Sequence, residues 1–390
     1  MTSFDAAERR RRLGVRHALA APATTTEDVT ASVVALHSTD PAAMTLSVLA
    51  RLERPDIAEV ERALYVDRSV VRILAMRRTV FAVPADRFDE FAATVRHSVA
   101  GPERRKLLGL LRASGIDDAE TVLEQGHAAV LAAAERLGEF SSADLQAADP
   151  LLATRVDIGT GSKYATQQSL ASRLLTVMSV EGSVVRTRPE GAWNSYRYRW
   201  AARGTWLPTP VAQPDEAEAR ARVARRWLER FGPALPEDLQ WWTGWTKGHT
   251  RAALATVDTA EVELEEGTGL VLADDLAPTP EPAPWVALLP ALDPTTMGWR
   301  HRGWYLGPHA ERVFDDVGNA GPTIWHDGRI VGGWAIRDDG TVATRLFTDV
   351  GREATDAIAE RAARLEKLLD GTVVKVRARR WTAVEKELRA

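Results

Sequence analysis

The spacing of apolar and polar residues in the first part of the chain predicts several helices followed by a β-hairpin. Apolar residues recur every three or four positions in four segments, which is the helical period. A β-branched and aromatic stretch around a basic Met-Arg-Arg turn follows and predicts two short strands. This order is typical of a winged-helix unit. The expected helices cover residues 5–20, 24–36, 41–52 and 56–66, with Thr25 or Thr26 capping the second, and the strands lie within 70–84.

The same order appears twice more, so the pattern predicts three tandem units. In the second copy Ser141 or Ser142 is the expected helix cap, and Pro-Glu-Gly-Ala forms the hairpin turn. The second copy has expected helices at 119–138, 141–149 and 165–182 and a hairpin at 183–201; the third has helices at 216–232, 235–245 and 246–257 and a strand at 262–267.

From about residue 262 the pattern changes to short alternating strands with Asp-Gly turns, the last of them at 372–378. One helix interrupts them and is expected to end at Gly371. All 13 tryptophans lie between Trp193 and Trp381, and a proline-rich stretch marks a domain change near 205–215. The predicted fold class is α+β, with three tandem winged-helix units followed by a β-rich, barrel-like C-terminal domain. The predicted domains are 1–90, 91–207, 208–262 and 263–390.

Composition narrows the class of protein. Hydrophobic residues make up 45% of the 390 positions and charged residues 27%, as in ordinary globular proteins. No apolar run approaches the ~20 residues that a membrane span needs, and no secretory signal pattern opens the chain. The sequence contains no cysteine, which excludes disulfides and thiol catalysis and indicates a cytoplasmic protein. The eight histidines show no metal-ligand spacing, so we expect no metal site.

Basic residues gather in three runs although the net charge is −4. The runs cover 9–12, 186–203 and 375–380, and they indicate either a nucleic-acid interface or solvated faces. The stretch Gly-Thr-Gly-Ser-Lys at 159–163 lacks the phosphate-loop spacing, but Ser162 and Lys163 are candidates for gripping a phosphate at a helix start. The alternative is a flexible joint. The candidate DNA-binding residues are Lys163, Arg186, Arg188, Asn194, Tyr196, Arg197 and Arg199.

The stretch His-Ser-Thr-Asp at 37–40 has two compatible interpretations. Asp40 followed by Pro41 matches a helix N-cap with proline at the first helical position. An aspartate there stays ionised, because the helix dipole favours the anion. His37 and Thr39 lie in the same tight turn, so an imidazole, a hydroxyl and a carboxylate converge. The turn is therefore either a polar joint or a catalytic cluster.

Three stretches carry a resemblance to the AlkZ/YcaQ family of winged-helix DNA glycosylases. They are "VVALHSTDPAAMTLSVLARL", "GSVVRTRPEGAWNSYRYRWA" and the segment from "ALLPALDPTTMGW" to "HDGRIVGGW". The family carries Gln-x-Gln or Gln-x-Asp at the same leucine-led turn, and His37 and Thr39 stand at those two positions here. Asp40 then precedes the shared Pro41.

The resemblance implies a monofunctional DNA glycosylase for alkylated or bulky N7-type purine adducts in duplex DNA, acting as a nucleoid-associated monomer without a cofactor. Asp40 would be the base or electrostatic stabiliser, His37 would orient water, and Thr39 would support the site by hydrogen bonding. No lysine stands in the motif, so base hydrolysis without strand cleavage is expected. The hairpin at 184–200 would probe the groove while a bulky lesion stays stacked.

Two alternatives come from other functional classes. A transcription regulator would use the wings to bind a defined operator, and a non-catalytic damage-binding protein would account for the replaced glutamines. The sequence leaves open whether Asp293 and Trp299 contact DNA.

Overall fold

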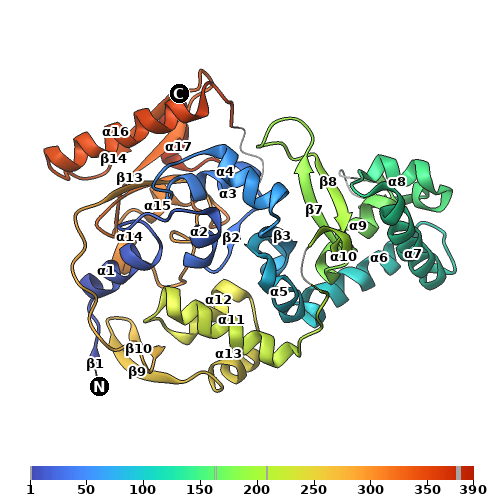
Figure 1. Cartoon of the computed structure of the whole chain (residues 1–390), viewed down its shortest axis with the longest axis horizontal. Helices are drawn as coiled ribbons and strands as arrows, with labels where there is room; N and C mark the ends of the chain where they lie inside the picture. Colours follow the sequence, from blue (N-terminus) through green and yellow to red (C-terminus); the bar gives the residue numbers. More distant parts are fainter. Residues whose placement is uncertain (1, 162, 164, 208–209, 375–378) are drawn as a thin grey trace. The chain divides into compact units, whose positions relative to one another are not determined.

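The computed structural model describes residues 2–161, 163, 165–207, 210–374 and 379–390. The chain forms two compact units (Figure 1): unit 1 combines residues 1–63 with 220–390, and unit 2 consists of residues 64–219. Unit 1 is therefore discontinuous along the chain. The physical reason lies inside unit 1, where the first helices pack against segments from the C-terminal half.

Unit 1 contains two open β-sheets surrounded by helices. β1 and β10 flank β9 in one sheet, and β11-β12-β13-β14 form an antiparallel sheet in chain order. The helices are α1 (Ala6–Arg16), α2 (Thr26–Ser32), α3 (Pro41–Leu49), α4 (Ile57–Glu61), most of α11 (Glu216–Phe231), α12 (Pro236–Thr243), α13 (Lys247–Leu254), α14 (Gly303–Leu306), α15 (Ala310–Val313), α16 (Arg352–Leu369) and α17 (Ala383–Arg389). The strands are β1 (Thr2–Ser3), β2 (Leu36–His37), β9 (Thr259–Leu264), β10 (Gly267–Leu272), β11 (Val286–Leu289), β12 (Thr323–His326), β13 (Arg329–Ile336) and β14 (Val342–Leu346).

The expected barrel is wrong for the described residues. The sheet β11–β14 ends in two separate edge strands, and α16 packs against both β11 and β14 instead of a closing ladder. Thr372–Val374 form no strand, and residues 375–378 of the expected last strand lie outside the described part of the chain. The Asp-Gly turn between β12 and β13 is confirmed, because Asp327 and Gly328 both have positive φ angles, as a tight hairpin turn requires.

Unit 2 is built around four adjacent strands of one sheet, in the order β4-β3-β7-β8. A core of buried side chains, most of them leucine, valine and alanine from α6, α7, α8 and α9, packs beside it. The helices are α5 (Phe88–Thr94), α6 (Gly101–Ala113), α7 (Ala119–Leu137), α8 (Ser142–Ala148), α9 (Leu170–Glu181) and α10 (Arg203–Trp206). The strands are β3 (Val70–Leu74), β4 (Val80–Pro84), β5 (Arg155–Ile158), β6 (Thr166–Ser169), β7 (Val184–Pro189) and β8 (Tyr198–Ala202).

One expected helix of unit 2 is shorter than its pattern indicated. Residues 166–169 pair with β5 as the strand β6, and α9 begins only at Leu170, where the Ser169 side chain caps the helix. Gly182 ends α9 in the left-handed conformation, as expected. The two strands around the Met-Arg-Arg turn, β3 and β4, are also confirmed.

A fully buried ion pair connects α3 to the C-terminal half of unit 1. The guanidinium of Arg51 donates to Asp293 Oδ1 and Oδ2 at 2.7 and 2.8 Å, and both side chains are completely inaccessible to solvent. Ser47 Oγ donates to the same carboxylate at 2.8 Å, and Arg51 also donates to the hydroxyl of Thr295. Asp293 therefore lies in the core and not on a DNA-accessible surface.

The aromatic residues around this ion pair are buried as well. Trp299 donates its indole N–H to the Phe231 carbonyl, and its ring stacks on the imidazole of His17. His17 is fully buried and makes a 2.8 Å hydrogen bond with Thr295. Burial, with the nearby positive charge of Arg51, holds the pKa of His17 well below its usual value, so the ring is neutral at physiological pH.

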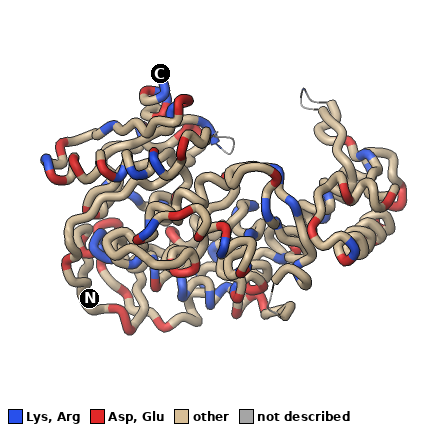
Figure 2. The backbone as a smooth tube through the Cα atoms, turned by 45° about the horizontal axis from the view of Figure 1, so that its top comes forward, with Lys and Arg blue, Asp and Glu red and all other residues tan. Residues whose placement is uncertain are grey.

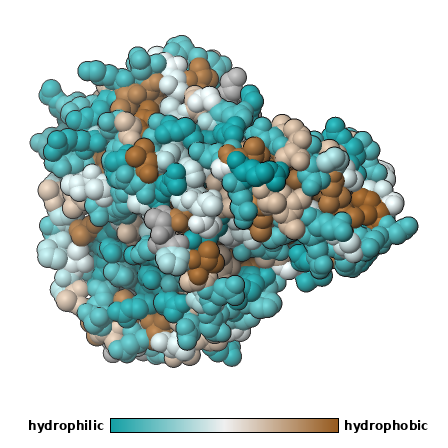
Figure 3. All heavy atoms as spheres, turned by 45° about the vertical axis from the view of Figure 1, so that its right-hand side comes forward, coloured by the Kyte–Doolittle hydropathy of each residue, from teal (hydrophilic) through white to brown (hydrophobic). Residues whose placement is uncertain are grey.

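Within the described residues, no helix combines the length and the apolar content that crossing a bilayer requires. On the face drawn in Figure 3, apolar side chains form separate patches among hydrophilic ones, and Figure 2 shows basic and acidic residues interspersed along the backbone.

We predict that Asp293→Asn strongly destabilises unit 1, by about 3–5 kcal/mol, because it leaves the buried guanidinium of Arg51 without its counter-charge. Urea denaturation followed by circular dichroism measures the loss. Asp338→Asn is the matched control, since Asp338 pairs with Arg389 at 2.9 Å but is 93% exposed, and such surface pairs are worth about 1 kcal/mol or less. Equal losses in the two variants would contradict a structural role for the buried pair.

Candidate functional site

The polar turn at 37–40 connects the short strand β2 to α3, and its capping role is confirmed. Asp40 Oδ1 accepts hydrogen bonds from the backbone N–H groups of Ala42 at 2.9 Å and Ala43 at 3.4 Å, and Pro41 is the first helical residue. The Asp40 side chain is nearly inaccessible, with 5% of the residue exposed. The carboxylate thus sits at the positive end of the helix dipole, where the anion is favoured.

The other members of the turn differ in their access to solvent. Ser38 is fully buried, whereas His37 and Thr39 are half-buried. His37 and Thr39 are therefore the residues of this turn that remain partly accessible to a ligand.

The backbone just before the turn is strained. Val34 has a φ angle of 66°, a left-handed conformation that β-branched residues rarely adopt, and its side chain is buried. Such a conformation costs on the order of 1–3 kcal/mol and persists only where the surrounding structure enforces it. Strained residues of this kind cluster at functional sites, which favours the catalytic interpretation of the neighbouring turn.

Two other helices of the chain begin directly after a residue that pairs in an isolated β-bridge, whereas α3 does not follow its strand directly. In unit 2, the backbone of Phe140 pairs with a strand and Ser141 directly after it caps α8. In unit 1, Ala234 pairs in the same way and Leu235 directly precedes α12. Between His37 at the end of β2 and the cap of α3, the residues Ser38 and Thr39 are inserted. Capping alone does not require these two polar residues.

The turn stands on a rigid element. All nine residues of α3 are buried, and the Arg51–Asp293 pair anchors the C-terminal end of the helix. Polar groups at its N-terminal end are therefore held in fixed positions, which a catalytic site requires.

The hairpin of β7 and β8 lies in unit 2 and has a longer loop than expected. Arg186 pairs with Trp200, a bulge follows, and the loop 190–197 replaces the predicted tight Pro-Glu-Gly-Ala turn. The loop closes where Glu190 N–H donates to the Arg197 carbonyl at 2.7 Å.

The predicted DNA-binding residues of the hairpin have different environments. Arg188 and Arg197 are exposed, and Arg197 forms a 2.5 Å ion pair with Glu190. Arg199 is half-buried and donates to the Glu139 carbonyl at 2.6 Å. Asn194 and Tyr196 are half-buried in the loop, and Arg186 is half-buried between two aromatic rings.

Lys163 does not stand at a helix start, contrary to the sequence-based expectation. It is exposed in the turn between β5 and β6, because residues 166–169 form a strand and α9 begins later. Ser162, its predicted companion, lies outside the described residues.

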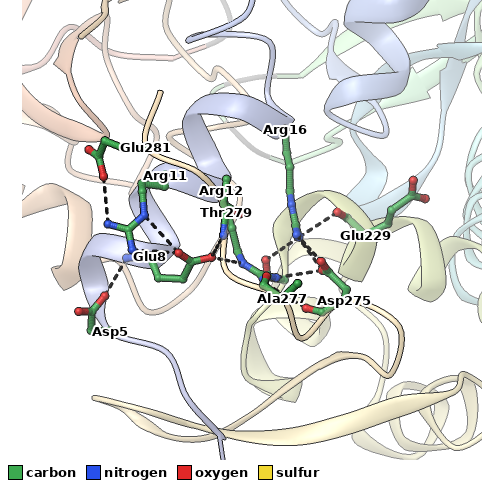
Figure 4. A network of polar contacts seen from close by, with 11 residues as sticks. Asp5, Glu8, Arg11, Arg12, Arg16, Glu229, Asp275, Ala277, Thr279 and Glu281 are labelled. Atoms are coloured by element: carbon green, nitrogen blue, oxygen red, sulfur yellow. Dashed lines mark hydrogen bonds and ion pairs between the residues drawn. The ribbon is translucent and has the colours of Figure 1, made fainter. Parts of the chain in front are cut away.

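Arginines of the run in α1 bind acidic side chains and carbonyl groups inside unit 1 (Figure 4). Arg12 donates to Glu8, to Asp275 and to the Ala277 carbonyl, and Arg16 pairs with Asp275 at 2.7 Å. In the C-terminal run, Arg379 forms a buried pair with Glu385, while Lys375 and Arg377 lie outside the described residues. These runs therefore contribute less to a basic surface than their sequence indicated.

Sequence reasoning missed three residues of unit 2 that belong to the same stacked group as two of the candidate arginines. Tyr65, Arg72 and Tyr198 stack with Arg186 and Arg188 in one continuous group. The alternation Tyr-Arg-Tyr-Arg-Trp at 196–200 was the available signal for the last strand. Arg72 carried no such signal, because it lies in an apolar strand.

Among the residues that the structure describes, no three histidine, aspartate or glutamate side chains gather as a metal ion would require.

Comparisons with known proteins place the chain beside one family. The family described as DNA glycosylase AlkZ-like matches residues 30–368. Among solved structures, the Streptomyces sahachiroi DNA glycosylase AlkZ superposes with a TM-score of 0.73 at 20% identity, covering 96% of this chain and 100% of that protein. No curated protein matches.

We predict that Asp40→Asn leaves stability nearly unchanged, whereas Asp40→Ala lowers the free energy of unfolding by about 1 kcal/mol, since asparagine caps as well as aspartate and alanine does not cap. Thermal and urea melts measure both effects. Asp56, whose side chain caps α4 by accepting from Ala58 N–H at 2.8 Å, provides the same pair of substitutions as a control. A large loss in Asp40→Asn alone would show that the charge, beyond the cap, stabilises the fold.

Proposed function

This chain belongs to the AlkZ-like DNA glycosylase family, and from that premise we propose that it hydrolyses the N-glycosidic bond of alkylated or bulky N7-type purine adducts in duplex DNA. The observation that carries the proposal is the lengthened polar turn at the N-terminus of α3, which lies within the family match. A helix joint needs only the cap. His37 and Thr39 supply further polar groups beside it, and both have access to solvent.

The proposed architecture is three tandem winged-helix units, and the element order supports it. The second winged-helix segment has the order helix, strand, helix, helix, wing, formed by α7, Phe140, α8, α9 and the β7–β8 hairpin. The third winged-helix segment has the same order, formed by α11, Ala234, α12, α13 and β9–β10. In the first, α2, β2, α3, α4 and the strands β3 and β4 follow one another in the same way along the chain.

The reaction requires little activation of the leaving group. An N7-alkylated purine carries a positive charge, so the bond between C1′ and the purine N9 breaks with its electron pair moving to the base and neutralising that charge. The sugar becomes oxocarbenium-like. A water oxygen then bonds to C1′ and loses one proton. Catalysis consists of stabilising the cationic sugar, placing the water and accepting the proton.

The residues of the turn divide these tasks. Asp40 accepts two backbone N–H groups at the helix N-terminus, and it is proposed to stabilise the cationic sugar electrostatically or to be the base that takes the proton from the water. His37 is more accessible and is proposed to orient the water. Thr39 supports the arrangement by hydrogen bonding. No cofactor enters this scheme, and the turn has no lysine for a Schiff base.

We propose that the β7–β8 hairpin of unit 2 binds DNA. Arg188 and Arg197 are exposed there and are suited to backbone phosphates, which supply affinity without sequence information. The β9–β10 hairpin, which is the wing of the third winged-helix segment, has the opposite charge. Three glutamates are exposed along it: Glu261, Glu263 and Glu265. An acidic wing repels phosphates, so of these two wings the β7–β8 hairpin is the proposed DNA contact.

We predict that Asp40→Asn keeps fold and DNA affinity but lowers base excision by about 10²–10⁴-fold, the usual range for a lost catalytic carboxylate. His37→Ala also reduces excision, because it removes the imidazole without changing the cap. The measurement is the single-turnover rate of abasic-site formation on a duplex that contains one N7-methylguanine. Asp56→Asn changes an equivalent cap elsewhere in unit 1 and is expected to keep the wild-type rate.

Three outcomes would overturn the proposed chemistry. A wild-type protein that binds alkylated duplex but releases no base would be a damage-binding protein. Affinity for one defined sequence, regardless of the lesion, would identify a transcription regulator. Normal excision by a stable Asp40→Asn protein would place the chemistry outside this turn.

We predict opposite effects for two neighbouring substitutions in the hairpin loop. Arg197→Ala weakens binding to every duplex. It also makes the negative slope of log K against log salt less steep by about one, because one phosphate contact is lost. Glu190→Gln strengthens binding by roughly twofold to fivefold, because it frees Arg197 from an exposed ion pair worth under about 1 kcal/mol. Fluorescence anisotropy at several salt concentrations measures both. Unchanged affinity and slope in both variants would remove the loop from the interface.

A further inference from the structure

Six side chains of unit 2 form one alternating column of guanidinium groups and aromatic rings. The order along the column is Arg188, Tyr65, Arg72, Tyr198, Arg186 and Trp200. The column is defined here as these six residues. It begins at an exposed arginine of the hairpin and ends at the tryptophan whose backbone pairs with Phe140.

The distances within the column are those of cation–π contacts. The Arg72 guanidinium lies 5.6 Å from the Tyr65 ring and 5.2 Å from the Tyr198 ring, and it also donates to Tyr65 Oη at 2.7 Å. The Arg186 guanidinium lies 5.0 Å from the Tyr198 ring and 5.2 Å from the Trp200 ring. Such contacts are worth ~0.5–1 kcal/mol when exposed and ~2 kcal/mol when desolvated.

The column contains a juxtaposition that is unfavourable without the rings. Arg72 of β3 lies directly opposite Arg186 of β7 in the sheet, and like charges at opposed positions destabilise a strand pair. Arg72 is also nearly inaccessible, with 2% exposed. The Tyr198 ring contacts both guanidinium groups and offers each an electron-rich face.

Desolvation affects the two arginines differently. Burial lowers the pKa of Arg186, and the positive charge of Arg72 lowers it further. Burial opposes the charge on Arg72 as well, but the phenol groups of Tyr65 and Tyr198 outweigh it and raise the pKa of Arg72. Both groups nevertheless remain cations at physiological pH, since an arginine pKa stays far above 7.

We propose that this column holds the β7–β8 hairpin in its DNA-binding position in the free protein, with Arg186 and Arg72 as positioning residues and Arg188 as the end that meets a phosphate. The proposal rests on the proposed function for its DNA partner. It gives Arg186 a different role from the phosphate contact expected from the sequence, because both flanks of its guanidinium are occupied by rings. A hairpin ordered in advance loses less conformational freedom on binding, which strengthens the complex without an added contact.

The experiment compares two methionine substitutions on the same strand. Arg186→Met keeps an unbranched apolar chain but removes the planar cation from the middle of the column. Arg188→Met makes the same change at the exposed end and is the matched control. Two quantities are measured for each full-length variant: amide hydrogen exchange of residues 184–202 without DNA, and the salt dependence of binding to an unmodified duplex.

For Arg186→Met, exchange in the hairpin increases and binding weakens by roughly fivefold to thirtyfold at fixed salt, while the slope of log K against log salt stays at the wild-type value. For Arg188→Met, the negative slope becomes less steep by about one, and amide exchange in the hairpin is unchanged. The amides of α9 report whether unit 2 remains folded. If they also exchange faster in Arg186→Met, Arg186→Lys is used instead, since lysine keeps the charge but not the stacking plane.

Two results would overturn the proposal. A salt slope reduced in Arg186→Met as much as in Arg188→Met would make Arg186 a phosphate contact. Unchanged hairpin exchange in the Arg186 variants would show that the column does not hold the hairpin. Failure of the wild-type protein to bind DNA would refute the proposed function instead, and the exchange measurement would still decide whether the column orders the hairpin.

Discussion

The buried ion pair between Arg51 and Asp293 determines where α3 lies in unit 1. Its two residues are 242 positions apart, and hydrogen bonds from Ser47 and to Thr295 complete it. Burying two charges is costly unless every donor and acceptor is satisfied, so this geometry tolerates little displacement. The polar turn lies at the other end of the same helix, so it is held in a fixed position as well. The conformation of residues 37–40 thus depends on a contact made far away along the chain.

Arginine has two distinct uses in this protein. Arg9, Arg12, Arg51, Arg72 and Arg203 are each 3% exposed or less and bind acids, carbonyl oxygens or aromatic rings inside their own unit. Arg188 and Arg197 are exposed. A basic run in the sequence is therefore a poor measure of basic surface here. The planar guanidinium suits both tasks, because it stacks on rings and binds carboxylates in pairs.

Local signals in the sequence predicted local structure well. The caps at Thr25, Ser141 and Asp40 and the Asp327–Gly328 turn depend on a few neighbouring residues, and the structure confirms them. Features that depend on distant partners were not predictable. β6 forms because β5 offers it a ladder, and Asp293 is buried because Arg51 is its partner. For the candidate site, the residue types were visible in the sequence, but the burial of Asp40 and the stacking of Arg186 were not.

The interrupted path of unit 1 has a consequence for how the protein is made. On the ribosome, residues 1–63 emerge with Arg51 long before Asp293 is synthesised, and unit 2 is translated in between. Unit 2 has its own sheet and core, and domains generally fold as units during synthesis. The apolar faces of the nascent N-terminal helices therefore stay uncovered until residues 220–390 are synthesised. During that interval they are natural clients for chaperones, and a pause in translation after residue 219 would prolong it.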